Sequence, residues 1–253
     1  MEPMEPIKIT AQPIKITAHM LSAVAMDVSE GLTLDGPLLW GLILDRHGDA
    51  ALSSPSAAEI ADETSRPDPE MPLAVHGDPG GWWCYAVSQA ELIGHCGTDV
   101  VHWHKRFDDT LAGELIERGA LDMGRRSKIN TASGEFKAYR MPLYLELVDR
   151  LEWYAIGDRE RIRDLLTRHI RHLGKKHARG HGAVIAWEVE PWDGPQDRWL
   201  WRSPGMPARP VPIQMLPDWS GHVTYAAFRP PAWAPTNQAV CAIGIANTDR
   251  NEL

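Results

Sequence analysis

The sequence contains little cysteine and no long apolar run. Its three cysteines, Cys84, Cys96 and Cys241, are odd in number and far apart, which argues against a disulfide framework and is typical of a reducing compartment. No stretch approaches the ~20 apolar residues of a membrane helix. The first residues also lack the basic and apolar regions of a signal peptide. We therefore expect a cytoplasmic protein without membrane contact.

The chain as a whole also has no excess of positive charge, because its formal net charge is −8. The charges are unevenly distributed. Residues 102–182 hold 17 of the 26 Lys and Arg residues but only 12 of the 34 Asp and Glu residues. This basic middle segment indicates either a confined nucleic-acid surface or the solvated faces of arginine-rich helices.

Motifs of the common enzyme classes are missing as well. The sequence has no G-x-S-x-G, no H-E-x-x-H, no kinase motifs and no pair of carboxylates at catalytic spacing. His95, Cys96, His102 and His104 invite a zinc interpretation, but their spacing matches no common structural zinc site. We therefore predict no catalytic residue, no metal site and no cofactor.

The chain begins with a repeat, because "PIKITA" occurs at Pro6–Ala11 and again at Pro13–Ala18. The two copies cannot both be the first strand of one compact fold. We expect the second copy to form it, as part of a strand over Ile14–Met26. Residues 1–12 are interpreted as a flexible or artefactual extension.

Two helices are predicted. The first begins near Asp35 and ends near Gly48, and Trp40 lies among its leucines, which indicates a core residue. The second has Asp158 as its N-cap candidate, and its apolar periodicity extends to Leu173.

Strands are expected at Gly81–Leu92, at Pro142–Gly157 and at 183–190. Together with the helices they give the order β–α–β, insertion, β–α–β. This order fits an α+β, ferredoxin-like (RRM-like) fold, an antiparallel sheet with helices on one face.

The domain boundaries follow from this order. We place one domain at 13–190, with a basic insertion at about 104–141 that forms a hairpin or a short helical arm. Residues 191–253 are rich in proline and tryptophan, and we expect them to form an extension packed on the domain.

The stretch "LGKKHARGHG" follows the second predicted helix. Gly174 is a natural helix stop, and Lys175 and Lys176 complement the negative end of the helix dipole. That explanation does not cover "ARGHG". A nucleotide-binding P-loop is excluded, because the strand and helix are in the reverse order and no G-K-[ST] is present. The remaining interpretations are a cradle for RNA phosphates and a plain connection between helix and strand.

Several ordered motifs carry a family resemblance. They are "LTLDGPLLWGLI", "MPLAV" before "WWCYAVSQA", "HKRFD", "GEFKAYRMPL", and "WYAIGDRERIRDLL" with "LGKKHARGHGAVIAWEVE". The pieces "RPVP" and "RPPAW" also agree. Over about residues 14–235 the chain resembles RAMP-superfamily CRISPR-associated proteins, and more closely the Cas-five-like subunit of type IV CRISPR effector complexes.

The resemblance implies a non-catalytic subunit of a ribonucleoprotein complex. Such a subunit caps the 5′ handle of the guide RNA and contacts the first Cas-seven-like backbone subunit. A type IV large-subunit-like protein is a further expected partner, and a contact with target DNA near the protospacer-adjacent motif stays open. The insertion corresponds to the thumb that shapes the handle, while guide pairing supplies sequence specificity.

The predicted RNA-binding residues come from the loop and from the insertion. In the insertion, "GRRSK" suits either RNA or a solvated loop, and "KAYR" places a ring between two cations, which suits stacking and phosphate contact. The full set is Gly174, Lys175, Lys176, His177, Arg179, Gly180, His181, Gly182, His104, Lys105, Arg106, Arg125, Arg126, Lys128, Lys137, Tyr139 and Arg140.

Two alternatives stay open. One is a protein-only scaffold without RNA contact, and the other is a metal-independent endoribonuclease that processes precursor guide RNA, as some RAMP relatives do. Such cleavage needs a base for the 2′-hydroxyl and a cation for the phosphate. His177, His181, Lys176 and Tyr139 have the required chemistry, but nothing in the sequence places them together.

Overall fold

The computed structural model describes residues 11–26, 31–48, 66–106, 113–114, 116–119, 132 and 137–244. The fold is α+β with antiparallel sheets, as predicted. Among the described residues, no helix is long and apolar enough to cross a membrane.

The central sheet has four antiparallel strands in the order β5-β8-β1-β9. They are β1 (Gln12–Met20), β5 (Glu91–Ile93), β8 (Arg150–Gly157) and β9 (Val184–Pro191). The second copy of the repeat therefore forms a central strand, with partners on both sides, as expected.

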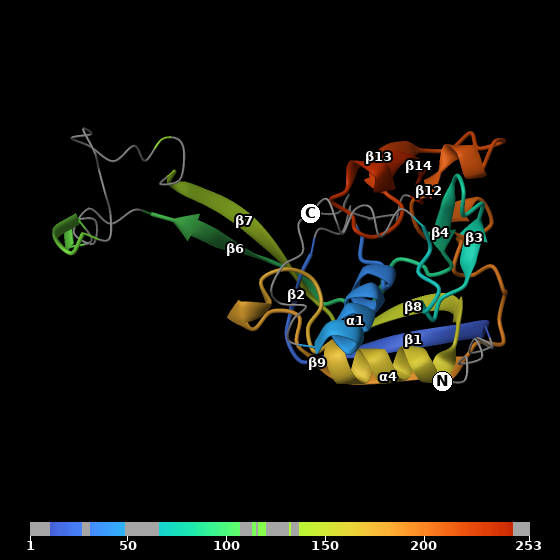
Figure 1. Ribbon diagram of the computed structural model, residues 1–253, viewed down its shortest axis with the longest axis horizontal. Coiled ribbons are helices and arrows are strands. Elements are labelled where there is room, and N and C mark those ends of the chain that lie inside the picture. The colour runs from blue at the N-terminus through green and yellow to red at the C-terminus, as the bar shows by residue number, and fades with distance from the viewer. Residues whose placement is uncertain are drawn as a thin grey trace, which may run out of the picture.

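Two helices pack together over this sheet (Figure 1). Helix α1 (Asp35–His47) follows β1, and α4 (Arg159–His169) follows β8. Asp158 caps α4 as predicted, because its carboxylate accepts a hydrogen bond of 3.0 Å from the backbone N–H of Arg161. The core between helices and sheet contains the apolar faces of both layers, including Ile14, Ile16, Leu38, Leu42, Trp153, Leu165 and Leu166.

The predicted strand over Ile14–Met26 is wrong in one respect, because it is divided between two sheets. Strand β1 ends at Met20, and a short β2 (Val24–Ala25) pairs instead with β7 (Tyr139–Leu147). Leu21, at the bend, is 67% exposed. The bend directs the chain from the central sheet to the base of a hairpin.

The predicted strand over Pro142–Gly157 is also two strands, β7 and β8. The break falls at Val148 and Asp149, where the Asp149 carbonyl accepts from the Met20 N–H at 2.9 Å. The break spans two residues, so the odd-numbered apolar positions continue in phase across it. Alternation alone therefore cannot reveal the break.

Strands β6 (Gly97–Lys105) and β7 form a hairpin with nine directly paired positions. Together with β2 they make a three-stranded sheet. Nine residues at about 3.3 Å each give a stem about 30 Å long, and Figure 1 shows it projecting from the body. The stem begins earlier in the chain than the predicted insertion at 104–141. The predicted start of the insertion lies near the outer end of the stem.

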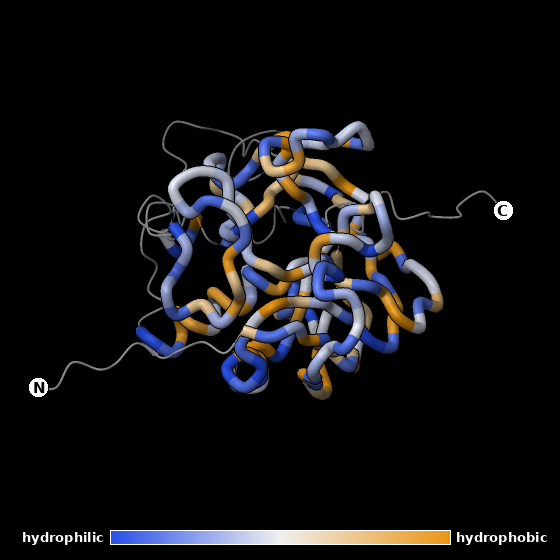
Figure 2. Tube along the Cα trace, turned by 90° about the vertical axis from the view of Figure 1, so that its right-hand side faces the viewer, coloured by the Kyte–Doolittle hydropathy of each residue, from blue (hydrophilic) through white to orange (hydrophobic). Residues whose placement is uncertain are grey.

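The extension after β9 packs on the opposite side from the hairpin in Figure 1. A second apolar cluster joins Cys84, Ala86 and Tyr154 of the domain to Trp199, Leu200, Val211, Phe228, Ala239 and Cys241 of the extension. In Figure 2, which views the molecule along its long axis, this body is rounded, and short apolar stretches alternate with polar ones.

The remaining strands are short, and they belong either to this extension or to a separate short hairpin that precedes it in the chain. They are β3 (Val75–Gly77), β4 (Trp83–Tyr85), β10 (Trp201–Ser203), β11 (Met206–Pro207), β12 (Val211–Pro212), β13 (Val223–Ala227) and β14 (Gln238–Ala242).

Candidate nucleic-acid interface

The glycine-rich loop 174–182 does not begin at a helix end. Helix α4 stops at His169, and Leu173 instead pairs with the far side of the loop through its backbone N–H, which donates to the Gly182 carbonyl at 2.8 Å. The helix-stop explanation of Gly174, Lys175 and Lys176 is therefore wrong. Apolar periodicity could not show this, because Leu173 is buried in the extended segment too.

Two of the loop glycines are needed for close packing. A Cβ on Gly174 would lie 2.5 Å from the Ala25 carbonyl oxygen, and one on Gly182 would lie 1.8 Å from the Leu173 carbonyl oxygen. Gly180 differs, because no atom of the described residues lies within 4 Å of its Cβ position, although its φ of 83° favours glycine. The loop therefore closes on itself and on the chain segment after β1.

That segment, Leu21–Ala25, holds the loop in place. The Lys175 N–H donates to the Ala25 carbonyl at 2.7 Å, and the Gly182 N–H donates to the Ala23 carbonyl at 2.9 Å. The Ser22 hydroxyl donates to the Gly180 carbonyl at 2.7 Å. Because β2 pairs with β7, the same segment fixes the loop against the base of the hairpin.

Within the loop, a single turn of 3₁₀ helix, η2 (His177–Arg179), follows Lys176, which has a left-handed φ of 62°. The ring of His177 lies 2.8 Å from the Gly174 carbonyl through Nε2 and stacks on His172. His177 therefore stabilises the turn, while Lys176 and Arg179 extend to the hairpin.

The two faces of the hairpin carry different side chains. Directly paired residues share a face, so Trp103 and Met141 lie with Lys105 and Tyr139 on one side. His104 and Arg140 are paired on the other side, both exposed. The ring and cations of "KAYR" are thus divided between two faces.

Trp103 joins the loop to the hairpin. The Lys176 ammonium nitrogen lies 3.7 Å from the centre of its ring, and the Arg179 guanidinium carbon lies 4.3 Å from it. Its indole N–H donates to the Tyr139 hydroxyl at 2.9 Å. These cation–π contacts bring two basic segments, more than 70 residues apart in sequence, onto one surface.

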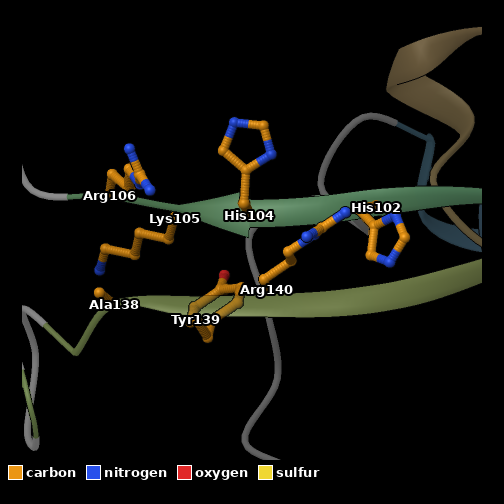
Figure 3. A pocket seen from close by; sticks show the side chains of 7 residues that line it. All are labelled: His102, His104, Lys105, Arg106, Ala138, Tyr139 and Arg140. Atoms are coloured by element: carbon orange, nitrogen blue, oxygen red, sulfur yellow. The ribbon is translucent and has the colours of Figure 1, made fainter.

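Two adjoining hollows mark this surface. The first, of about 630 Å³, is lined by His102, His104, Lys105, Arg106, Ala138, Tyr139 and Arg140. In Figure 3, His104 and Lys105 point to opposite sides of β6, and Arg140 extends from β7 toward His102. The second, of about 430 Å³, is lined by Val101, His102, Trp103, Leu143, Arg179 and His181. His102 lines both hollows, although His104 and Arg140 of the first lie on the hairpin face opposite Trp103, and only the second contains groups of the loop.

The arginines of α4, in contrast, are largely paired with carboxylates. Arg161 and Arg168 both bond to Asp45 of α1, and Arg159 and Arg163 both bond to Glu160. Burial alone would raise the pKa of Asp45, but hydrogen bonds from His169, Arg168 and Arg161 lower it to about 2. The positive surplus of residues 102–182 is therefore not carried by α4.

Not every predicted residue joins this surface. Arg125, Arg126 and Lys128 lie outside the described residues, so their prediction stays a prediction. Lys137 is exposed just before β7. His95 bonds Glu146 at 2.8 Å, and the Cys96 thiol donates to the Leu147 carbonyl, so both have contacts within the base of the hairpin.

Sequence reasoning missed Trp103 and Ser22 as residues of the site. The signal for Trp103 is the alternation of "VHWHK", which places it opposite His102 and His104 on a strand. For Ser22 we find no signal, because its role depends on a loop 158 residues further along the chain.

The α+β body with a basic hairpin and a basic glycine-rich loop agrees with the family resemblance. Comparison with known proteins identifies the family. The chain is a CRISPR type IV associated protein. Residues 12–243 match the family model of CRISPR type IV associated protein Csf3, and the chain belongs to that family. No curated protein matches the chain significantly. Membership implies that it acts in a complex with other type IV subunits.

Proposed function

We propose that this chain is a non-catalytic subunit of a type IV effector complex that binds and caps the 5′ handle of the guide RNA. One observation carries the proposal: Lys176 and Arg179 of the loop lie over Trp103 of the hairpin. Loop and hairpin thereby present a single cationic surface with an aromatic ring in it. Cations for phosphates together with rings for bases are what single-stranded RNA requires.

We further propose that the body is a ferredoxin-like RAMP fold and the hairpin its thumb. In support, the chain order β1-α1-β5-β8-α4-β9 gives the sheet order β5-β8-β1-β9 with two helices on one face.

The Cas-seven-like backbone subunit and the large-subunit-like protein are the proposed protein partners. Val100 and Tyr144 support such contacts, because they are directly paired on the hairpin face opposite Trp103 and are 43% and 47% exposed. A contact with target DNA near the protospacer-adjacent motif belongs to the same proposal.

A metal-independent endoribonuclease is the second candidate function, and two of its candidate residues have contacts within the protein. His177 is bonded to the Gly174 carbonyl, and the Tyr139 hydroxyl accepts from Trp103. Incubation of the purified chain with repeat-containing RNA in EDTA tests it. Specific cleavage that is absent in a His181→Ala variant would show that the chain is an enzyme.

The binding proposal is tested with a variant pair of equal charge. K176A/R179A removes two loop cations, and R159A/R163A removes two α4 arginines that bond to Glu160. We expect K176A/R179A to weaken binding of single-stranded RNA at least ten-fold, because each phosphate contact contributes to affinity through counterion release. Fluorescence anisotropy at several salt concentrations measures both the affinity and its dependence on salt.

The salt dependence supplies the decisive comparison. The slope of log affinity against log salt should fall by about 0.7 for each phosphate that K176A/R179A no longer neutralises. The slope for R159A/R163A should equal that of the wild type. Equal affinities and slopes for both variants would contradict the proposal.

A further inference from the structure

We propose that the hollow beside Trp103 holds one unpaired nucleobase, which stacks on the indole ring. The inference rests on the proposed RNA-binding function, and it assigns a nucleotide site to residues that the function alone does not specify. Trp103 would then be the residue through which the loop and hairpin contact a base rather than the backbone.

The ring is held in a fixed orientation, as a stacking platform requires. Its N–H bonds to Tyr139 at 2.9 Å, and its backbone is paired with Met141 within a regular ladder. Trp103 is only half-buried. A base therefore meets a preformed surface, which limits the entropy lost on binding.

The walls of the hollow suit a base in size and chemistry. Val101 and Leu143 are directly paired and give an apolar floor beside the ring. Arg179 and His181 supply polar groups to the lining. The volume of about 430 Å³ lies within the range of small-molecule sites, and no carboxylate is among the described residues that line either hollow.

Lys176 and Arg179 now lie over the ring that a base would use. Both are also cations that the phosphates of a bound strand would attract. A bound strand therefore permits an exchange in which the cations move to phosphates and a base takes their place on the indole. Stacking of a base is at least as favourable as an exposed cation–π contact, so the exchange costs little.

The experiment separates base contacts from phosphate contacts. Two fluorescein-labelled probes are used, an eight-nucleotide oligoadenylate and an octamer of the same ribose phosphates without bases. The wild-type chain should bind oligoadenylate on the order of ten-fold tighter than the abasic octamer. W103L should lose most of this ratio while retaining its affinity for the abasic octamer.

Three further variants complete the design. W103F keeps an aromatic ring and should retain part of the ratio. It thereby distinguishes the loss of stacking in W103L from a folding defect. Y139F removes the acceptor of the indole N–H. It should lower the ratio of the two affinities but not abolish it, because the indole ring itself is kept. W233L removes an exposed tryptophan of the extension and should leave the ratio unchanged.

The outcomes distinguish this inference from the proposed function. An unchanged ratio in W103L, or tighter binding of both probes because its cations are released, would overturn the base site while leaving RNA binding intact. If the wild type binds neither probe, the proposed function fails and the base site with it.

Discussion

Gly180 and Gly182 lie two residues apart in the loop 174–182 but have opposite surroundings. Both have a left-handed φ, of 83° and 70°. Only Gly182 faces backbone, because the Cβ of any other residue would overlap the Leu173 carbonyl. Gly180 therefore has only a conformational requirement for glycine, whereas Gly182 has a conformational and a steric one.

We expect Gly182→Ala to unfold the loop, since the overlap is with main chain that cannot move without breaking the Leu173–Gly182 hydrogen bond. Gly180→Ala should cost only about 1–2 kcal/mol of left-handed strain and retain RNA binding. Thermal unfolding and anisotropy with single-stranded RNA measure both effects. Similar losses in the two variants would show that strain, and not close approach, governs the loop.

Single residues also show where sequence patterns stop being informative. Trp40 lies among leucines on a predicted helix, which indicates a core position, yet it is 40% exposed. Its neighbours Leu38, Leu39 and Leu42 face the core as expected. Helical periodicity gives the buried stripe but not its width, which depends on where α4 packs.

At the scale of elements, α1 and α4 are joined by one carboxylate as well as by apolar packing. Asp45 of α1 bonds His169, Arg168 and Arg161 of α4 at 2.6, 2.8 and 2.9 Å. Its depressed pKa means that the ionised form is bound more strongly in the folded state.

We expect Asp45→Asn to lower the free energy of unfolding by about 1–2 kcal/mol at pH 7, a value discounted for the exposure of the arginines. The folded pKa is about 2 against an ordinary 3.8. The contribution is thus fully present above pH 4 and is lost as the pH falls toward 2. Urea unfolding at pH 7 and pH 3 should therefore show a smaller difference at pH 3.

Asp164→Asn is the matched control, because Asp164 bonds Arg161 and Arg168 from within α4. It does not join two elements, so its effect at pH 7 should be smaller. A difference for Asp45→Asn that is unchanged at pH 3 would mean that the loss comes from packing and not from charge.

The elements themselves are predictable from periodicity, but their ends are not. The α+β class, both helices and the N-cap at Asp158 follow from local pattern and capping chemistry. The breaks at Leu21 and at Val148 do not, because they are set by pairing with segments far along the chain. The same holds for the end of α4, where Leu173 finds a buried place outside the helix.

At the scale of the whole molecule, the basic hairpin projects from one side, and the extension after β9 covers the other (Figure 1). The charge distribution allowed a basic surface to be predicted within residues 102–182. Its assembly from loop and hairpin could not be predicted, since it depends on Trp103 meeting Lys176 and Arg179 in space. The attachment of the extension likewise includes, besides its apolar cluster, an ion pair between residues far apart in sequence.

That pair is Arg209 of the extension and Asp35 at the start of α1, which are 1% and 2% exposed and bonded at 3.3 Å. Arg209 also donates to the backbone carbonyls of Tyr85, Val87 and Phe228. We expect Arg209→Met to destabilise the chain by about 3–5 kcal/mol, because a buried carboxylate and several carbonyls lose their partner.

Limited proteolysis and urea unfolding measure this effect, with cleavage expected first within residues 191–244. Arg229→Met is the control: Arg229 packs over Trp83 and bonds Asn237 in the same extension, but within the described part of the chain it pairs with no buried carboxylate. Its loss should cost about 1 kcal/mol.

In the double variant D35N/R209M the two losses should be less than additive, since each single change removes the same ion pair. Additive losses would show that Arg209 acts through the carbonyls alone and that the extension is not fastened to α1 by charge.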